Sequence, residues 1–478
     1  MSFSEPAFLF WFLPWLLLVY FVAPRAFRNA VLLAASLYFC AWGESIHVLL
    51  LIASIVLNHA FGLMVAPRGG PSGSRAWLAA AVTANLLLLG IFKYAGFLVG
   101  NINSLLQALA LPPIAARPVG LPLGISFYTF KGLSYLIDVY RGQFPPERSP
   151  FRLGLHISFF PQLIAGPIVR YAHVKEQLVS RAVTIEDFAS GVTRFTLGLG
   201  KKMIFASALA RPADGIFSLP PDQLSAGLAW FGLVAYALQI YLDFSSYSDM
   251  AIGLGRMFGF STMENFDFPY FSTSLREFWR RWHISLSTWF RDYLYIPLGG
   301  NRVRPWRVHF NLLCVFFLCG LWHGASWNFV IWGLFHGSFL VLERWPLLAR
   351  LRALPAPLHH AYLLFVVLVS WVFFRTETLG DSIQFLKAMF GFASLGDAVP
   401  GFGMFSNALV LVAVIAGALG STPLVKAFQR MEESLTLRDR RLGTAFAAVR
   451  LSLMVTVLLY SAMMMAAGSY SPFIYQRF

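Results

Sequence analysis

The sequence predicts an all-α polytopic integral membrane protein, and three observations lead to this fold class. The 478 residues are 58% hydrophobic and only 12% charged, whereas soluble domains carry about a quarter charged residues. Residues 7–24 and 224–242 each match or exceed the ~18 uncharged residues that mark a membrane span. Cations gather between such runs, as at Arg25 and Arg28. A soluble fold could not bury this much apolar surface, so lipid is the expected solvent.

About eleven transmembrane helices are expected, in the order of the apolar runs. The candidate spans lie near residues 7–24, 29–43, 46–66, 76–92, 189–210, 224–250, 308–322, 326–342, 357–374, 404–420 and 451–468. No soluble domain fits between them, so residues 1–478 are expected to form one membrane-embedded domain. The longest polar insert, 426–450, is rich in arginine and is expected to be a basic, amphipathic connector on the cytoplasmic side.

The net charge of +15 fits the positive-inside pattern of membrane proteins. Cationic loops orient the chain and attract anionic lipid, whereas no basic face on a soluble module points to nucleic acid. Glu5 precedes the first apolar run and Arg25 follows it, so we expect a retained first span with the N-terminus outside the cytoplasm. The three cysteines lie within apolar runs and predict neither a disulfide framework nor a metal site.

Two apolar stretches, 121–142 and 156–171, do not resemble simple spans. The first contains Pro122 and Gly124, and the second contains Pro161 and Gly166. Broken backbone leaves N–H and C=O groups that lipid cannot satisfy, so such segments occur at membrane depth only inside protein or along a wet cavity. They favour re-entrant segments around a membrane-crossing tunnel, and ordinary proline-kinked helices are the alternative.

A histidine near the middle of an uncharged run is the first candidate for catalysis. Residues 308–342 contain no Asp, Glu, Lys or Arg, yet they hold His309, His323 and His336. Burial keeps an imidazole neutral, which is the form that a general base needs. His323 is flanked by Trp322 and by small residues such as Gly320, which would leave room for a substrate. A histidine that bridges helices through a carbonyl is the alternative.

The stretch "FWRRWHISLSTWFRDYLYIPLGG" (278–300) is too polar to span a membrane. The spacing of its apolar residues is typical of an amphipathic or partly buried helix, and its tryptophans are expected at a membrane interface. Arg280 and Arg281 would reach headgroups or bind the phosphates of a ligand. Neither role accounts for His283, which is therefore a second candidate for the site.

A further polar run, "YLDFSSYSDMAIGLGRMFGF", carries Asp243 and Asp249. Carboxylates within a membrane helix pair with cations, and the arginines of 276–291 are the expected partners. The sequence contains no G-x-S-x-G elbow, no Walker A motif and no H-E-x-x-H motif, so the usual signals of hydrolases, ATPases and metalloproteases are missing.

Five motifs follow one another along the chain: "LPLGISFYTFKGLSYLIDVYRG", "FFPQLIAGPIVRY", "YLDFSSYSDMAIGLG", "ENFDFPYFSTSLREFWRRWHISLSTWFRDYLYIPLGGNR" and "GLWHGASWNFVIWGLFHG". Together they resemble the membrane-bound O-acyltransferase superfamily, and more narrowly its bacterial branch that contains the membrane subunit of alginate O-acetyltransferase. The resemblance covers about residues 5–377, and 378–478 match weakly. It implies helices around a tunnel, with the two polar active-site positions at His323 and His283.

The resemblance also implies a reaction. Acetyl-CoA would be a cytoplasmic donor substrate rather than a bound cofactor, His323 would act as base or nucleophile, and His283 would orient the donor or stabilise an oxyanion. The family position implies a bacterial inner-membrane location, a periplasmic or membrane-anchored acetyltransferase partner and a polysaccharide acceptor such as alginate. The competing functions are D-alanyl transfer to teichoic acid, peptidoglycan O-acetylation, lipid acylation and, from another class, transport of a lipid-linked sugar.

Overall fold

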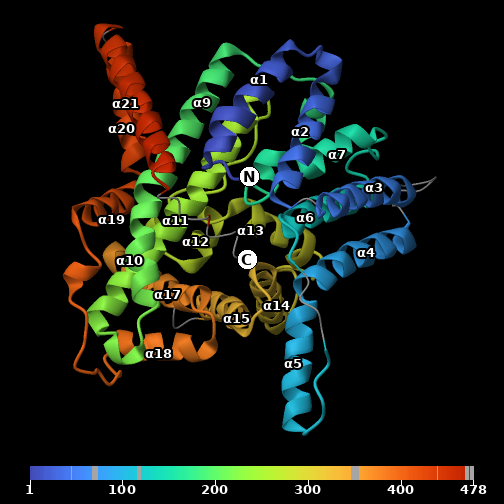
Figure 1. The fold of residues 1–478 in the computed structure, drawn as a ribbon. Helices are drawn as coiled ribbons and strands as arrows, with labels where there is room; N and C mark the ends of the chain where they lie inside the picture. Colours follow the sequence, from blue (N-terminus) through green and yellow to red (C-terminus); the bar gives the residue numbers. More distant parts are fainter. Residues whose placement is uncertain are drawn as a thin grey trace. The chain divides into compact units, whose positions relative to one another are not determined.

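The computed structural model describes residues 1–44, 46–66, 74–115, 120–345, 355–438, 440–468 and 473, and in these parts every regular element is a helix (Figure 1). The all-α prediction is therefore confirmed. The described residues form two compact units, each assembled from segments that are distant in the sequence. The single membrane-embedded domain stays a prediction.

Unit 1 comprises Met1–Gly191, Leu254–Met263 and Trp322–Ser326. Its helices are η1 (Phe8–Phe12), α1 (Leu13–Val22), η2 (Arg25–Phe27), α2 (Arg28–Gly43), α3 (Val48–Val65), α4 (Arg75–Lys93), α5 (Ala95–Ala108), α6 (Ile125–Tyr140), α7 (Pro150–Ser158), η3 (Phe160–Gln162), α8 (Tyr171–Val179) and the start of α9 (Ile185–Gly200). The end of α11 and the last two residues of α14, Trp322 and His323, also belong to this unit.

Unit 2 comprises Val192–Gly253, Glu264–Leu321 and Trp327–Phe478. Besides the rest of α9, its helices are η4 (Lys201–Ala206), α10 (Ser207–Phe217), η5 (Pro221–Gln223), α11 (Ala226–Met257), η6 (Pro269–Phe271), α12 (Leu275–Arg281), α13 (Ile284–Phe290), η7 (Arg291–Tyr295), α14 (Pro305–His323), α15 (Trp327–Leu342), α17 (Ala356–Arg375), α18 (Leu379–Met389), η9 (Phe402–Met404), α19 (Ala408–Gly420), α20 (Leu424–Arg438) and α21 (Arg440–Ala466).

A helix lies in each of the eleven stretches that we predicted as spans. Within the described residues, however, only six helices are long and apolar enough to cross a membrane by length and composition, or seven if the bent pair α19 and α20 counts as one span. The six are α3, α4, α11, α14, α17 and α21 from Arg441 onward. The chain is thus a multi-pass membrane protein, while eleven spans are not confirmed.

The two stretches predicted to be broken differ. Residues 156–171 are broken as expected, since α7 ends at Ser158 and the short η3 and an irregular segment precede α8. The prediction was wrong for most of 121–142, because α6 runs without interruption from Ile125 to Tyr140. Glycines with positive φ stand on both sides of this helix, Gly124 at 74° and Gly142 at 70°, and a Cβ at Gly124 would lie 2.3 Å from the carbonyl oxygen of Leu163.

Gly132, inside α6, permits a close approach to α3. A Cβ at this position would lie 2.6 Å from Oδ1 of Asn58 on α3. Asn58 in turn exchanges side-chain hydrogen bonds with Asn85 of α4 at 3.1 and 3.2 Å, and both amides are buried. These two buried amides therefore satisfy each other inside the protein, as the membrane environment requires. The tunnel itself stays a prediction.

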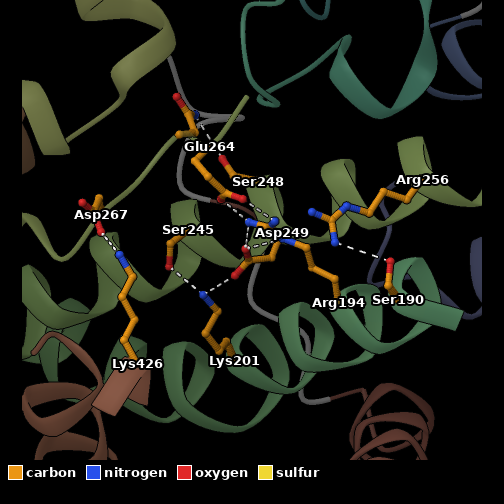
Figure 2. A network of polar contacts seen from close by, with 11 residues as sticks. Ser190, Arg194, Lys201, Ser245, Ser248, Asp249, Arg256, Glu264, Asp267 and Lys426 are labelled. Carbon is orange, nitrogen blue, oxygen red and sulfur yellow. Dashed lines mark hydrogen bonds and ion pairs between the residues drawn. The ribbon is translucent and has the colours of Figure 1, made fainter. Parts of the chain in front are cut away.

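The basic connector 426–450 is helical over its described residues, which are divided between α20 and α21; Asp439 lies outside the described residues. Lys426 at its start pairs with Asp267 at 2.6 Å (Figure 2), and its ammonium nitrogen lies 5.1 Å from the ring centroid of Phe268. The connector thereby contacts the irregular segment between α11 and η6 in unit 2.

Candidate active site

His323 is the last residue of α14, and only 2% of its surface is exposed. It follows Trp322, whose ring meets the imidazole edge-on with centroids 5.0 Å apart. The ring of Trp322 also packs against Phe127 and Phe130 of α6, at centroid distances of 5.4 and 5.6 Å. These aromatic contacts within unit 1 surround the candidate histidine with apolar side chains.

Lys93, the last residue of α4, holds the chain at this histidine. Its buried amino group donates to the carbonyl oxygens of Trp322 and His323, the latter at 3.4 Å. It also donates to Oγ of Ser126 at 3.2 Å and lies 5.7 Å from the ring centroid of Trp322. The last carbonyls of a helix lack intrahelical donors, so a lysine there is favourable. We did not predict this role of Lys93, although a lysine that ends an apolar run was a visible signal.

The small residue Gly320 does not make room for a substrate as we expected. A Cβ at Gly320 would lie 2.2 Å from the carbonyl oxygen of Phe329, and one at Gly333 would lie 2.2 Å from that of Phe316. The two glycines therefore allow the backbones of α14 and α15 to approach closely in unit 2. Their role is helix packing.

His283 lies between α12 and α13 and is fully buried. Its φ of 43° and ψ of 56° place it in the left-handed region, which a side-chain-bearing residue adopts at a cost of about 1–2 kcal/mol. The ring of Phe244 meets the imidazole edge-on at 4.7 Å between centroids. Burial lowers the pKa of His283 from 6.5 to about 3, so the imidazole is neutral at physiological pH.

Backbone hydrogen bonds flank this strained residue on both sides. The N–H of Ile284 donates to the carbonyl of Asn265 at 2.9 Å, and the N–H of Asp267 donates to the carbonyl of Arg281 at 3.0 Å. The segment 265–267 thus fixes the chain before and after His283. We did not predict this role of Asn265, because an asparagine in a polar loop gives no periodic signal.

The tryptophans around His283 are core residues, and our prediction of a membrane-interface belt was wrong for them. Trp279, Trp282 and Trp289 are 8%, 1% and 7% exposed. Trp282 packs against Phe278 and Trp371 at centroid distances of 5.5 and 5.2 Å. The tryptophans of this stretch therefore pack in the protein core rather than anchoring a surface helix.

The two arginines that precede His283 differ in their surroundings. Arg280 is exposed on α12. Arg281 is half-buried and donates to Glu277 at 2.7 Å, one helical turn earlier. Backbone and hydroxyl hydrogen bonds from Thr273, together with Arg281, lower the pKa of Glu277 against the opposing effect of burial. Arg280 is thus the arginine whose charge is more available to a ligand.

The carboxylates of α11 are paired with cations, as predicted, but Asp249 has other partners than the arginines of 276–291. Arg194 donates to Asp249 at 2.9 Å, and Lys201 lies 2.5 Å from its other oxygen (Figure 2). Arg194 also donates to Glu264 at 2.6 Å. Lys202 lies 2.5 Å from Asp243, and both side chains of this pair are buried. These ion pairs tie the end of α9 and η4 to α11 within unit 2.

His336, another histidine of the run 308–342, has a structural role. Its Nδ1 accepts a hydrogen bond from the indole of Trp279 at 3.4 Å, and its Nε2 lies 3.0 Å from Oγ of Ser370. Both ring nitrogens are thereby engaged with side chains of neighbouring elements. His309 is half-buried on α14.

The structure places the two candidate histidines in different units, His323 in unit 1 and His283 in unit 2. Each lies where a helix ends or begins, and an aromatic ring meets each imidazole edge-on. Within the described residues, no group of three or more His, Cys, Asp or Glu side chains is arranged to hold a metal ion. The arrangement offers two buried imidazoles in apolar surroundings, which suits proton transfer or nucleophilic attack on an acyl group.

Comparison with known proteins gives the family. The model of the membrane-bound O-acyltransferase family, MBOAT, matches residues 153–378, a range that includes both histidines. A probable alginate O-acetylase of Azotobacter vinelandii is 41% identical over the full length of both chains. One from Pseudomonas aeruginosa is 44% identical over 82% of this chain and 76% of its own length. A peptidoglycan O-acetyltransferase of Helicobacter pylori is 37% identical over 81% of this chain and 80% of its own.

The alignment to the Azotobacter protein covers the whole chain, whereas the alignment to the Pseudomonas aeruginosa protein covers 82% of it. The weak match that we expected for residues 378–478 stays a prediction. The order of the motifs, the helical fold and the full-length identity lead to one conclusion. This chain belongs to the membrane-bound O-acyltransferase family and is an O-acyltransferase.

Proposed function

We propose that this protein takes acetyl groups from cytoplasmic acetyl-CoA and supplies them for the O-acetylation of alginate. The observation that carries the proposal is the 41% identity, over the full length of both chains, to a probable alginate O-acetylase. Further probable alginate O-acetylases are 40–44% identical. The same acceptor class is therefore the simplest assignment for this chain.

His323 is the catalytic residue of the proposal. As a general base, it takes the proton of an acceptor hydroxyl while the oxygen attacks the thioester carbonyl; the C–S bond then breaks, and the thiolate of CoA receives the proton. As a nucleophile, it forms an acetyl-imidazole and releases CoA, and the acceptor oxygen then takes the acetyl group. The apolar burial of His323 supports both routes, since it favours a neutral imidazole and excludes water that would hydrolyse the thioester.

His283 is proposed to orient the donor or to stabilise the oxyanion that develops on the thioester carbonyl. An N–H of a neutral imidazole is a suitable donor for that charge. The low pKa of His283 supports this role, because a neutral ring keeps one N–H and adds no buried charge before reaction. Trp322, Arg280 and Arg281 are weaker candidates for holding the donor, with the exposed Arg280 as the best placed for a CoA phosphate.

The proposal places the chain in the bacterial inner membrane, with the N-terminus in the periplasm. The single acid Glu5 before the first apolar run and the cations Arg25 and Arg28 after it support this orientation. A periplasmic or membrane-anchored acetyltransferase is proposed to receive the acetyl group and place it on the polysaccharide. Purification from mild detergent extracts tests this partner: a protein that acetylates alginate when entirely alone would contradict it.

The central test is acetylation of alginate in cells. The full-length protein is produced in an alginate-making bacterium that lacks its own alginate O-acetylase, and the acetyl content of the polymer is measured by proton NMR. The wild type is expected to restore acetylation, and His323→Ala is expected to abolish it. A His323→Ala variant that restores full acetylation would overturn the assignment of the catalytic residue.

Peptidoglycan O-acetylation is the second candidate function, and the 37% identity to the Helicobacter pylori enzyme favours it over lipid acylation and over transport of a lipid-linked sugar. Alginate and peptidoglycan acetylation would share the donor and differ in the acceptor. Acetyl content of peptidoglycan, measured in the same cells, separates them: acetyl on peptidoglycan and none on alginate would select the second candidate.

A further inference from the structure

The N-terminus of α13 is capped by a residue that is distant in the sequence. His283 occupies the N-cap position of this helix, yet its side chain makes no capping hydrogen bond. The carbonyl of Asn265 accepts the N–H of Ile284 at 2.9 Å, and Oδ1 of Asn265 accepts the N–H of Ser285 at 3.2 Å. Asn265 therefore satisfies two of the N–H groups that have no intrahelical partner at the start of α13, and its bond to Ser285 is the one that an N-cap side chain would ordinarily make.

The remaining contacts of Asn265 connect this cap to α11. Oδ1 also accepts the hydroxyl of Ser285 at 2.9 Å, and Nδ2 donates to Oγ of Ser248 at 3.1 Å. Asn265 is 1% exposed, so losing these bonds would leave buried polar groups unpaired. Ser248 lies one turn after Phe244, whose ring packs against the imidazole of His283. One amide thus joins the helix after His283 to the helix that supports its ring.

In this arrangement the capping of α13 does not depend on the imidazole of His283. A histidine that capped its own helix would direct a ring nitrogen at the backbone, whereas here another residue supplies the cap. The left-handed backbone at His283 costs free energy and persists only because the surroundings enforce it. The bond from Asp267 to Arg281 and the bonds of Asn265 act on the two sides of that residue.

We infer that Asn265 is a positioning residue for acyl transfer. It fixes the backbone conformation of His283 and hence the direction of the imidazole ring. The inference rests on the proposed function and extends it to a residue outside the two histidines. Asn265 does not touch the reacting groups. It acts through His283, and that property can be tested separately from any general effect on folding.

The experiment measures transfer of radiolabelled acetyl from acetyl-CoA to alginate in permeabilised cells of the alginate-making bacterium, which contain the full-length protein together with the acetyltransferase partner of the proposed function. Asn265→Ala is expected to lower the transfer rate about 10- to 100-fold, since small misplacements of a catalytic group cost this much. Asn265→Asp keeps the acceptor oxygen and is expected to retain at least about a third of the rate. Asn407→Ala is the matched control, because Asn407 caps α19 in the same unit through the N–H of Val410 at 2.9 Å. It is expected to leave the rate unchanged.

A double-variant cycle isolates the positioning role. In a His283→Ala background, adding Asn265→Ala is expected to change the residual rate less than about twofold, because the residue through which Asn265 acts is gone. Equal losses in both backgrounds would overturn the inference and leave the proposed function intact. Full activity of His283→Ala alone would instead refute the role that the proposed function gives to His283. If the Asn265→Ala protein does not accumulate, the Asn265→Asp variant provides the test, because it keeps the acceptor oxygen. A transfer rate of Asn265→Asp below about a tenth of the wild-type rate would contradict the inference.

Discussion

The two candidate histidines are held in place by different kinds of contact. His323 ends a helix in unit 1, and the amino group of a single long side chain, Lys93, binds its carbonyl and that of Trp322. His283 has a left-handed backbone in unit 2, and main-chain hydrogen bonds on both sides, supplemented by the amide of Asn265, enforce that conformation. The position of His323 is therefore held by one side chain from another helix, whereas that of His283 is held jointly by backbone hydrogen bonds and by the side chain of Asn265.

The largest expected difference between the two positions concerns catalysis. His323→Ala removes the proposed base or nucleophile and is expected to lower acetyl transfer about 10²–10⁴-fold or more. His283→Ala removes an orienting or oxyanion-stabilising group, so the loss is expected to be smaller, about 10²-fold. The rate of radiolabelled acetyl transfer to alginate, normalised to the amount of protein in the membrane, measures both. A larger loss at His283 than at His323 would reverse the roles.

Replacing Lys93 tests whether one side chain holds His323 in place. Lys93→Met leaves the buried carbonyls of Trp322 and His323 without this donor, which is expected to cost about 1–3 kcal/mol of stability and about tenfold in transfer. Melting temperature in detergent and the transfer rate are the measurements. Lys387→Met, at an exposed site on α18, is the control and is expected to change neither. Unchanged transfer in Lys93→Met would show that other contacts suffice at His323.

The sequence predicted the helical class and the need for buried carboxylates to find cations, whereas the catalytic roles of the two buried histidines stay predictions. It could not predict which cations they find, because the partners of Asp249 lie 55 and 48 residues away, on α9 and at the start of η4. The burial of Trp282 could not be predicted either, because a tryptophan in an apolar chain is found both in a protein core and at a membrane interface. Lys93 and Asn265 show the same limit: their function depends on tertiary contacts with Trp322 and Ser285 that no local spacing encodes.

The pH dependence of stability provides a third test, at His283 alone. Its pKa is lowered from 6.5 to about 3 by burial, so the folded state excludes a proton that the unfolded chain binds below pH 6.5. The folded state with a neutral His283 therefore has its full stability above pH 6.5. As the pH falls from 6.5 toward 3, the folding equilibrium constant decreases by up to about tenfold per pH unit. His283→Asn removes the titrating group while the other histidines remain. Unfolding at pH 7, 6 and 5 should therefore depend less on pH in this variant, and equal dependence would contradict the burial of a neutral ring.

The smallest expected effect is a difference in stability between glycine and alanine variants, which depends on the backbone conformation at His283 and at His323. Glycine adopts a positive φ without a Cβ clash, so His283→Gly is expected to be more stable than His283→Ala by about 1 kcal/mol. His323 is helical, so glycine there should be less stable than alanine by about 0.5–1 kcal/mol, which reverses the order. Melting temperatures of the four purified variants measure both differences. The same order at both positions would mean that His283 is not held in a left-handed conformation, and the positioning by Asn265 would then lose its basis.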